Sequence, residues 1–157
     1  MDINFETARL KLRPFNVKDL DAFMEYRSDL EWMQYQGFKG LTRDQYVNVL
    51  FKDIDLEGGN QLALVLKDTD KLIGDLYLHA ADSRICLGYS LNKKYTKNGY
   101  INEILEAVVK RCIESGYVVC AAVEKDNVDS INVLKKLGFK YVGTNRHDEL
   151  QYLKIEL

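Results

Sequence analysis

The spacing of apolar residues divides the first part of the chain into one strand and two helices. Residues 9–13 read Arg-Leu-Lys-Leu-Arg, and this period of two is typical of a half-buried strand. Over 16–27 an Asn that can serve as N-cap is followed by apolar residues at helical spacing. Thr42 and Gln45 form a capping box, which predicts a second helix over 42–57, ahead of two glycines.

The middle of the chain predicts three consecutive strands. Apolar runs at 62–66 and 72–78 flank the turn sequence Asp-Thr-Asp, and a third run follows at 85–91 after a short link. Links this short join neighbouring antiparallel strands, so we expect a meander.

The last part of the chain predicts a helix between two parallel strands. Residues 99–116 carry an apolar stripe with a period of 3.6, and 117–123 is apolar throughout, as expected of a strand buried on both faces. Together with the preceding strand they form a strand-helix-strand crossover. A short helix at 127–137 and strands near 139–142 and 150–157 complete the chain.

Seven strands and four helices in this mixed order predict an α+β (mixed α/β) fold. A chain of 157 residues, 46% of them hydrophobic, is long enough for one domain spanning residues 1–157. The net charge of −2 gives no basic field, which argues against nucleic acid or a membrane surface as partner. No apolar run reaches the ~18 residues of a membrane span. We expect a small-molecule or peptide partner.

The three cysteines, Cys86, Cys112 and Cys120, match no zinc or redox spacing, and each lies in an apolar element. This pattern indicates unpaired thiols in a reducing compartment, and no metal site. The chain begins with an acidic segment rather than a signal sequence. A cytoplasmic protein is therefore expected.

The loop at 92–100, between the third strand of the meander and the strongest helix, is a candidate phosphate site. Backbone N–H groups at a helix N-terminus are unpaired, and the helix dipole favours an anion there. Lysines 93, 94 and 97 add positive charge, and Gly99 allows an anion to approach the backbone closely. A lysine-rich loop is also common as plain solvated surface, so this segment alone leaves both readings open.

Three segments together resemble the GCN5-related N-acetyltransferases (GNAT), in their RimJ/RimL-like branch. Residues 127–139, with Asn127, Ser130 and a final Leu-Gly-Phe, are similar to motif B of that family. Residues 88–103 resemble motif A, and 7–14 (Thr-Ala-Arg-Leu-Lys-Leu-Arg-Pro) resemble the first strand of the RimL-like branch. The set covers nearly the whole chain in the family's order.

The resemblance implies a GNAT fold, with a central mixed sheet in which the strands at 85–91 and 117–123 splay apart to admit the pantetheine arm of acetyl-CoA. It implies an N-acetyltransferase that moves an acetyl group from acetyl-CoA to a primary amine of a peptide N-terminus, a polyamine or another small amine, by direct attack on the thioester. It also allows a homodimer. The cofactor-binding residues that it implies are Leu91, Thr96, Lys97, Asn98, Gly99, Tyr100, Ile101, Asn127 and Ser130.

Two positions of motif A depart from the family pattern. Thr96 stands where Arg or Gln is usual, and Ile101 stands where Gly or Ala is usual. Because backbone amides do most of the binding, Thr96 should weaken it only modestly. Ile101 either crowds the phosphates or packs inward.

Acetyl transfer requires a neutral amine, a donor for the thioester carbonyl oxygen, and a proton for the departing thiolate. The resemblance assigns the second task to backbone around Leu87 and Tyr89. The Glu that many relatives use as base is replaced by Cys86, and the Tyr that some use as acid by Leu134. Ser130 is then the candidate general acid, although a serine there can equally cap the helix or bond a carbonyl.

These replacements leave other functions open. A non-catalytic acetyl-CoA-binding sensor with a degenerate site is the main alternative. A nucleophilic pair of His79 and Cys86 would lie diagonally across adjacent strands, ~7–8 Å apart and too far for a reactive hydrogen bond.

The acceptor site is the part that the sequence defines least. Glu31, Trp32 and Tyr35 lie where relatives build the acceptor cleft. A carboxylate there fits either a cationic amine or a solvated face, and aromatic residues between two helices fit either a pocket or the core. Substrate binding by these three residues is a hypothesis.

Overall fold

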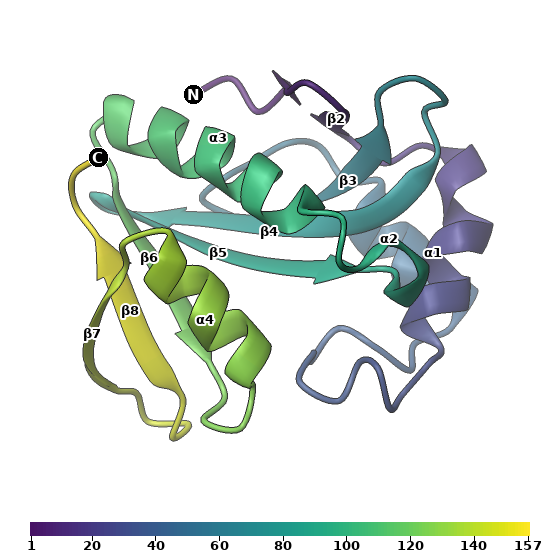
Figure 1. Cartoon of the computed structure of the whole chain (residues 1–157). Coiled ribbons are helices and arrows are strands. Elements are labelled where there is room, and N and C mark those ends of the chain that lie inside the picture. Colours follow the sequence, from purple (N-terminus) through teal and green to yellow (C-terminus); the bar gives the residue numbers. More distant parts are fainter.

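The computed structural model describes all 157 residues, and its eight strands form one mixed sheet in the order β1-β2-β3-β4-β5-β6-β8-β7 (Figure 1). The strands are β1 Phe5–Glu6, β2 Leu10–Arg13, β3 Asn60–Leu66, β4 Leu72–Ala81, β5 Arg84–Leu91, β6 Val118–Val123, β7 Lys140–Thr144 and β8 Leu150–Lys154. The helices are α1 Leu20–Arg27, α2 Arg43–Leu50, α3 Tyr100–Glu114 and α4 Val128–Lys136, with single 3₁₀ turns at Val17–Asp19 and Lys93–Tyr95. None of the helices is long and apolar enough to cross a membrane.

The α+β prediction is confirmed, with two differences in the elements. The eighth strand, β1, pairs with β2. With only two residues, β1 is too short to show a periodic pattern. The second helix ends at Leu50 rather than near residue 57. Beyond it the Asn60 side chain accepts a hydrogen bond from the Asp55 N–H at 2.6 Å, a local bond that competes with helix formation.

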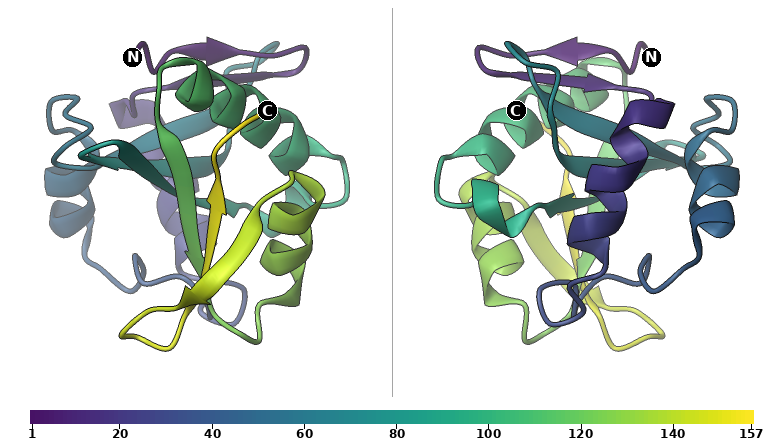
Figure 2. Two further views of the ribbon diagram at one scale, coloured as in Figure 1. Left: turned by 90° about the vertical axis from the view of Figure 1, so that its left-hand side faces the viewer. Right: turned by 90° about the vertical axis from the view of Figure 1, so that its right-hand side faces the viewer.

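The central strands are buried because helices cover both faces of the sheet. In β3, Leu62 and Leu64 pack in the core beneath α3, whereas Ala63 and Val65 pack against α1 and α2. Figure 2 shows α3 and α4 on the opposite side of the sheet from α1 and α2. This covering ends toward the far end of β6, where Ala122 is exposed, so β6 is not buried on both faces along its whole length as expected.

The sheet opens between β5 and β6. Their parallel ladder has three pairs and ends at Cys86 and Cys120, while β5 stays paired with β4 as far as Leu91. Beyond Cys120, β6 keeps its antiparallel pairing with β8 as far as Val123. The second half of β5 therefore has a partner on one side only, and the two strands diverge in Figure 1.

A disulfide joins Cys86 and Cys120 at the last pair before the opening, where the two Cα atoms are 4.5 Å apart. The prediction of three unpaired cysteines is therefore wrong for these two, and the argument from thiols to a reducing compartment loses its basis. The two cysteines are 34 positions apart in the chain, and no sequence motif predicts that they pair. The register of the β5–β6 ladder brings them together. Cys112 is free, and burial raises the pKa of its thiol to about 11, which keeps it unreactive near neutral pH.

Reduction of the Cys86–Cys120 bond is expected to lower the free energy of unfolding by about 2–4 kcal/mol, because the unfolded chain regains the freedom of a 34-residue loop. Denaturant unfolding with and without reductant measures this difference. Alkylation of the denatured, unreduced protein should find Cys112 as its single free thiol. Three alkylated thiols would contradict the pairing.

A carboxylate on α3 ties the N-terminal strands to the start of that helix. Glu103 accepts hydrogen bonds from the Thr7 hydroxyl at 2.5 Å, from the Arg9 N–H at 3.0 Å and from the Arg9 guanidinium at 2.7 Å. Burial acts to raise the pKa of Glu103, but these hydrogen bonds outweigh burial, and its pKa lies below the ordinary value of 4.5. This contact fixes the first turn of α3, next to the loop that the sequence identifies as a phosphate site.

Because the folded-state pKa of Glu103 is depressed, its contribution to stability is complete above the ordinary pKa and is lost as the pH falls through the folded value. We expect Glu103→Gln to cost stability near neutral pH, and the difference from the wild type to shrink as the pH falls below the ordinary pKa of 4.5 and through the folded-state pKa. Denaturant unfolding across this range is the measurement. Glu106→Gln, an exposed position on the same helix, is the control. A pH-independent difference would rule out this role.

Candidate active site

The N-terminus of α3 presents a row of free backbone N–H groups. The N–H groups of Lys97, Asn98 and Gly99 have no hydrogen-bond partner in the protein. The N–H groups in the first turn of α3 also lack partners within the helix, because no helical carbonyl lies four residues before them. Lys97 and Gly99 both have positive φ, 64° and 78°, which turns successive N–H groups to one side. The loop is held by the Asn98 side chain, whose amide donates to two carbonyls of the same turn. This is a ready anion site.

Two of the predicted phosphate contacts look different in the structure. The N–H of Thr96 donates to the Lys93 carbonyl at 3.3 Å, and its hydroxyl donates to the same oxygen at 2.8 Å, so the free amides begin at Lys97 rather than at Thr96. Ile101 is partly buried against the main core, which answers the question that the sequence left open: it packs inward. The branched side chain is therefore no obstacle at the helix N-terminus.

Of the three lysines in this loop, two have other partners. Lys94 is 3.3 Å from a Glu25 carboxylate oxygen, and the Lys93 ammonium lies over the Trp32 ring. Lys97 is exposed and makes no ion pair within the protein. The positive charge here comes from the backbone N–H groups, from Lys97 and from the Arg9 guanidinium, which lies over the Tyr100 ring and is partly neutralised by Glu103.

The free edge of β5 supplies a second set of backbone groups. Ala81 and Arg84 close the two-residue turn between β4 and β5 and form a hydrogen-bonded pair, so by alternation Leu87, Tyr89 and Leu91 direct their backbone groups away from β4. Leu87 directly follows the last pair with β6, whereas Tyr89 lies further into the opening. The Tyr89 N–H is therefore the freer donor of the two backbone groups that the sequence analysis named.

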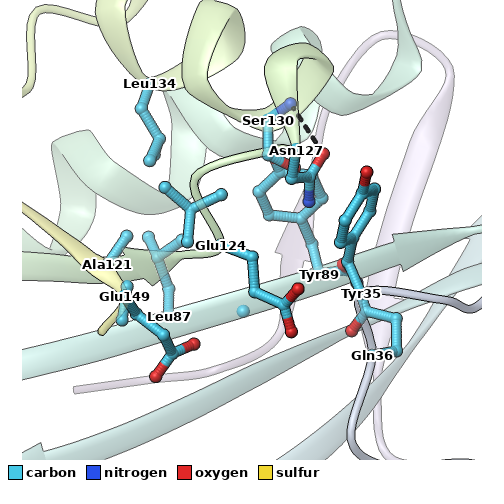
Figure 3. Close-up of a pocket in the computed structure, with 13 residues that line it drawn as sticks. Tyr35, Gln36, Leu87, Tyr89, Ala121, Glu124, Asn127, Ser130, Leu134 and Glu149 are labelled. Atoms are coloured by element: carbon cyan, nitrogen blue, oxygen red, sulfur yellow. Dashed lines mark hydrogen bonds between the residues drawn. The ribbon is translucent and has the colours of Figure 1, made fainter. Parts of the chain in front are cut away.

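A cavity lies in this opening (Figure 3). Its lining comes from β5, from the end of β6 and the loop after it, from α4, from the β7–β8 turn and from the segment between α1 and α2, residues 28–42. The polar side chains that line it are Tyr35, Gln36, Tyr89, Glu124, Asn127, Ser130 and Glu149. Of the residues named from the sequence, it brings together Leu87, Tyr89, Asn127, Ser130 and Tyr35.

The 28–42 segment spans the cavity from β5 to the loop after β6. Trp32 Nε1 donates to the Leu91 carbonyl at 2.7 Å, and Gln36 Nε2 donates to the Tyr89 carbonyl at 3.2 Å. On the other side of the opening the Tyr35 hydroxyl donates to the Asp126 carbonyl at 3.1 Å. The segment thus satisfies carbonyls on the free edge of β5 and leaves the Tyr89 N–H available.

The model of the acetyltransferase (GNAT) domain family matches residues 9–140 of the chain. The chain belongs to the GNAT family. This GNAT chain is 29% identical over 156 residues to the uncharacterized N-acetyltransferase p20 of Bacillus licheniformis, with 91% of this chain and 85% of p20 covered. Its fold matches a GNAT acetyltransferase from Bacillus anthracis with a TM-score of 0.82 at 23% identity, covering 96% of this chain and 95% of that one.

A further structural match is a RimL ribosomal L7/L12 alpha-N-protein acetyltransferase solved in complex with coenzyme A. Its TM-score is 0.80 at 16% identity, and 95% of each chain is covered. The predicted GNAT fold is confirmed, and the RimJ/RimL-like branch is consistent with this match. The protein is thus an acyl-CoA-dependent acetyltransferase with acetyl-CoA as co-substrate. The free N–H groups at the start of α3 fit the pyrophosphate of that co-substrate.

In this GNAT site three polar side chains line the cavity where the start of α4 meets β5. Asn127 caps the helix, with its side-chain oxygen accepting from the Ser130 N–H at 3.3 Å (dashed in Figure 3). The Ser130 hydroxyl makes no hydrogen bond to a backbone carbonyl, so the purely structural role considered for it lacks a contact. The Tyr89 hydroxyl is buried beside Ser130 without a hydrogen bond of normal geometry. Burial raises the pKa of Tyr89, and Ser130 partly offsets this rise.

The Cys–His alternative does not fit the GNAT site. His79 and Cys86 are direct cross-strand partners rather than diagonal ones, which corrects the expected geometry. The Cys86 sulfur is bonded to Cys120, and neither residue lines the cavity. Leu134, at the position of the expected acid Tyr, lines the cavity with an apolar side chain that also packs in the core.

Two of the three proposed acceptor residues lie away from the GNAT cavity. Trp32 lines a different hollow, together with Asp29 and Lys93, and Glu31 is exposed and lines neither. Tyr35 does line the cavity. Sequence reasoning missed Glu124, Glu149 and Gln36, because polar residues in irregular segments give no periodic signal.

Proposed function

We propose that this acetyltransferase acetylates a primary amine that is bound in the cavity between β5 and β6. One observation carries the proposal: the cavity lies where the β5–β6 ladder ends, so it contains both the free edge of β5 and Ser130 at the start of α4. Acetyl-CoA, when bound, supplies a thioester to this space. The free N–H groups from Lys97 into α3 would hold its phosphates.

Each chemical task then has a group at the opening. The Tyr89 N–H is a fixed donor for the thioester carbonyl oxygen, which gains negative charge during the attack. Because this donor is already in place, the protein does not have to rearrange during the reaction. Ser130 is the proton donor for the departing sulfur, and the buried Tyr89 hydroxyl beside it can replace the proton that Ser130 gives up.

Ser130→Ala is expected to lower kcat by about 10²-fold, at the lower end of the range for general acid catalysis, with little change in the KM for acetyl-CoA. Tyr89→Phe is the matched variant, because it removes the adjacent hydroxyl and keeps the ring. Steady-state kinetics on both separate the roles. An unchanged kcat in Ser130→Ala removes Ser130 from the mechanism, and a large loss in Tyr89→Phe alone transfers the role to Tyr89.

The reaction itself is tested by measuring thiol release from acetyl-CoA with a panel of amines that includes peptides with free N-termini, diamines and monoamines. We expect release that depends on the amine, with the acetylated product identified by mass. Tight binding of acetyl-CoA without turnover on any amine would instead support the sensor function.

This activity supports one further proposal, about location. We place the enzyme in the cytoplasm, because acetyl-CoA is an intracellular metabolite. A disulfide such as Cys86–Cys120 is unusual in that compartment. Alkylation of the denatured, unreduced protein, which counts its free thiols, therefore also bears on location. A homodimer stays a prediction from the family.

A further inference from the structure

The cavity between β5 and β6 has a one-sided charge. Its lining includes two carboxylates, Glu124 and Glu149, and no Lys, Arg or His. Glu124 makes no hydrogen bond or ion pair through its side chain, and Glu149 accepts a single hydrogen bond, from the Asn145 amide at 3.1 Å. Lys125, next to Glu124 in the chain, has its ammonium 2.7 Å from Asp148 instead. Arg146, near Glu149 in the chain, donates to His147 at 3.2 Å and makes no ion pair. Both carboxylates therefore lack a cation.

The two carboxylates come from neighbouring strands at matching positions. Val123 pairs with Leu150 in the antiparallel β6–β8 ladder, so one more step of the register sets Glu124 opposite Glu149. Directly opposed residues have Cβ atoms about 5 Å apart, and like charges in that arrangement repel. Figure 3 draws both side chains among the residues that line the cavity. Two carboxylates without a cation partner thus face each other at the cavity, Glu124 exposed and Glu149 partly exposed.

The position of Glu124 also suits it to act on the reacting nitrogen. It follows the last residue of β6, across the opening from Tyr89, and in Figure 3 its carboxylate points toward Gln36 and Tyr35. A positively charged amine must lose a proton before it can attack, and the usual Glu on β5 is absent because that position is Cys86. Glu124 is one of the two carboxylates in the cavity that could take over the role of that missing base.

Building on the proposed function, we propose that Glu124 and Glu149 form the acceptor subsite and that the acceptor is a small aliphatic diamine or polyamine. Glu124 binds the reacting ammonium and accepts its proton, and Glu149 binds a second ammonium of the same molecule. A peptide N-terminus brings one positive charge to a cavity that carries two negative ones, so a dication complements it better.

The proton and bond balance closes with groups in the cavity. The amine nitrogen bonds the acetyl carbon, and the carbon–sulfur bond breaks. Of the two protons that the ammonium nitrogen loses, one passes to Glu124 and then to solvent. The other leaves the nitrogen after the attack and passes through Glu124 and solvent to the Tyr89 and Ser130 hydroxyls, where it restores the proton that Ser130 gives to the departing sulfur.

The test compares 1,4-diaminobutane with butylamine as acceptors, for the wild type, Glu124→Gln and Glu149→Gln. We expect the wild type to prefer the diamine in kcat/KM by at least about tenfold, as one charge-assisted contact provides. Glu149→Gln should raise the KM for the diamine by a similar factor and leave butylamine nearly unchanged. Glu124→Gln should lower kcat for both amines by about 10²-fold or more. Asp126→Asn, an exposed acid in the same loop outside the lining, is the control for a general charge effect.

A second readout needs no turnover. Removing either carboxylate relieves the repulsion, so both Gln variants should melt about 1–3 °C above the wild type, and 1,4-diaminobutane alone should raise the melting temperature of the wild type only. Wild-type turnover of other amines with both variants unaffected would overturn the subsite and keep the proposed function. Binding of acetyl-CoA with no amine acetylated at all would overturn both.

Discussion

Asp75→Asn is expected to lower the free energy of unfolding by about 3–5 kcal/mol, because it leaves the Arg27 guanidinium charged and uncompensated in the protein interior. Asp75 is fully buried on β4 and accepts from Arg27 Nη2 at 2.6 Å, from Gln61 Nε2 at 2.5 Å and from the Tyr26 hydroxyl. Denaturant unfolding gives the value directly.

The same substitution should disturb the acceptor side of the cavity. Arg27 Nη1 donates to the Phe38 carbonyl at 2.9 Å, within the 28–42 segment that also contacts Tyr89 through Gln36. We therefore expect a raised KM for the amine and a smaller change for acetyl-CoA. The control is Asp70→Asn, which breaks a more exposed pair with Arg13 and should cost about 1 kcal/mol or less. Equal decreases in the free energy of unfolding in the two variants would contradict the larger cost expected for breaking the buried Arg27–Asp75 pair.

The second large effect is expected at the start of α3. Gly99→Glu places a carboxylate beside the free N–H groups of the loop, where it would repel the phosphates and compete for the same donors. At separations near 4 Å such repulsion is roughly 1–4 kcal/mol, so the affinity for acetyl-CoA should fall roughly 100-fold. In the wild type, acetyl-CoA at 100 times its Kd should raise the melting temperature by about 5–10 °C, and in the variant this shift should largely vanish.

Gly116→Glu is the matched control for this variant. Gly116 also has a positive φ, 89°, and open space around it, so the backbone strain of the substitution is similar. It lies beyond the other end of the 15-residue helix α3, roughly 20 Å away. An equal loss of the thermal shift in both variants would mean that strain, rather than charge at the phosphate site, causes the effect.

The sequence predicts the parts of this enzyme that depend on local patterns. Three features are each set by residues close together in the chain: the 3.6-residue stripe of α3, the apolar run of β6 and the Asn127 cap. All three are found where expected. The free N–H groups proposed to hold the cofactor phosphates were predictable for the same reason, because unpaired N–H groups occur at the N-terminus of any helix.

What the sequence does not predict depends on register between distant segments. Cys86 meets Cys120, and Glu124 comes opposite Glu149, only because β6 pairs with β5 on one side and with β8 on the other. Read along the chain, Glu124 looks like any solvated loop residue. The carboxylate of Glu31 was named instead, since it lies in the right segment, but its side chain does not reach the cavity.

The most direct test of the whole account is the map of backbone amide shifts on adding acetyl-CoA to ¹⁵N-labelled protein. We expect the largest changes at the amides of Tyr89, Lys97, Asn98 and Gly99 and in the first turn of α3, with few changes in the α1–β4 half of the sheet. Saturable shifts confined to other regions, with these amides unmoved, would contradict the claim that acetyl transfer takes place in the opening between β5 and β6.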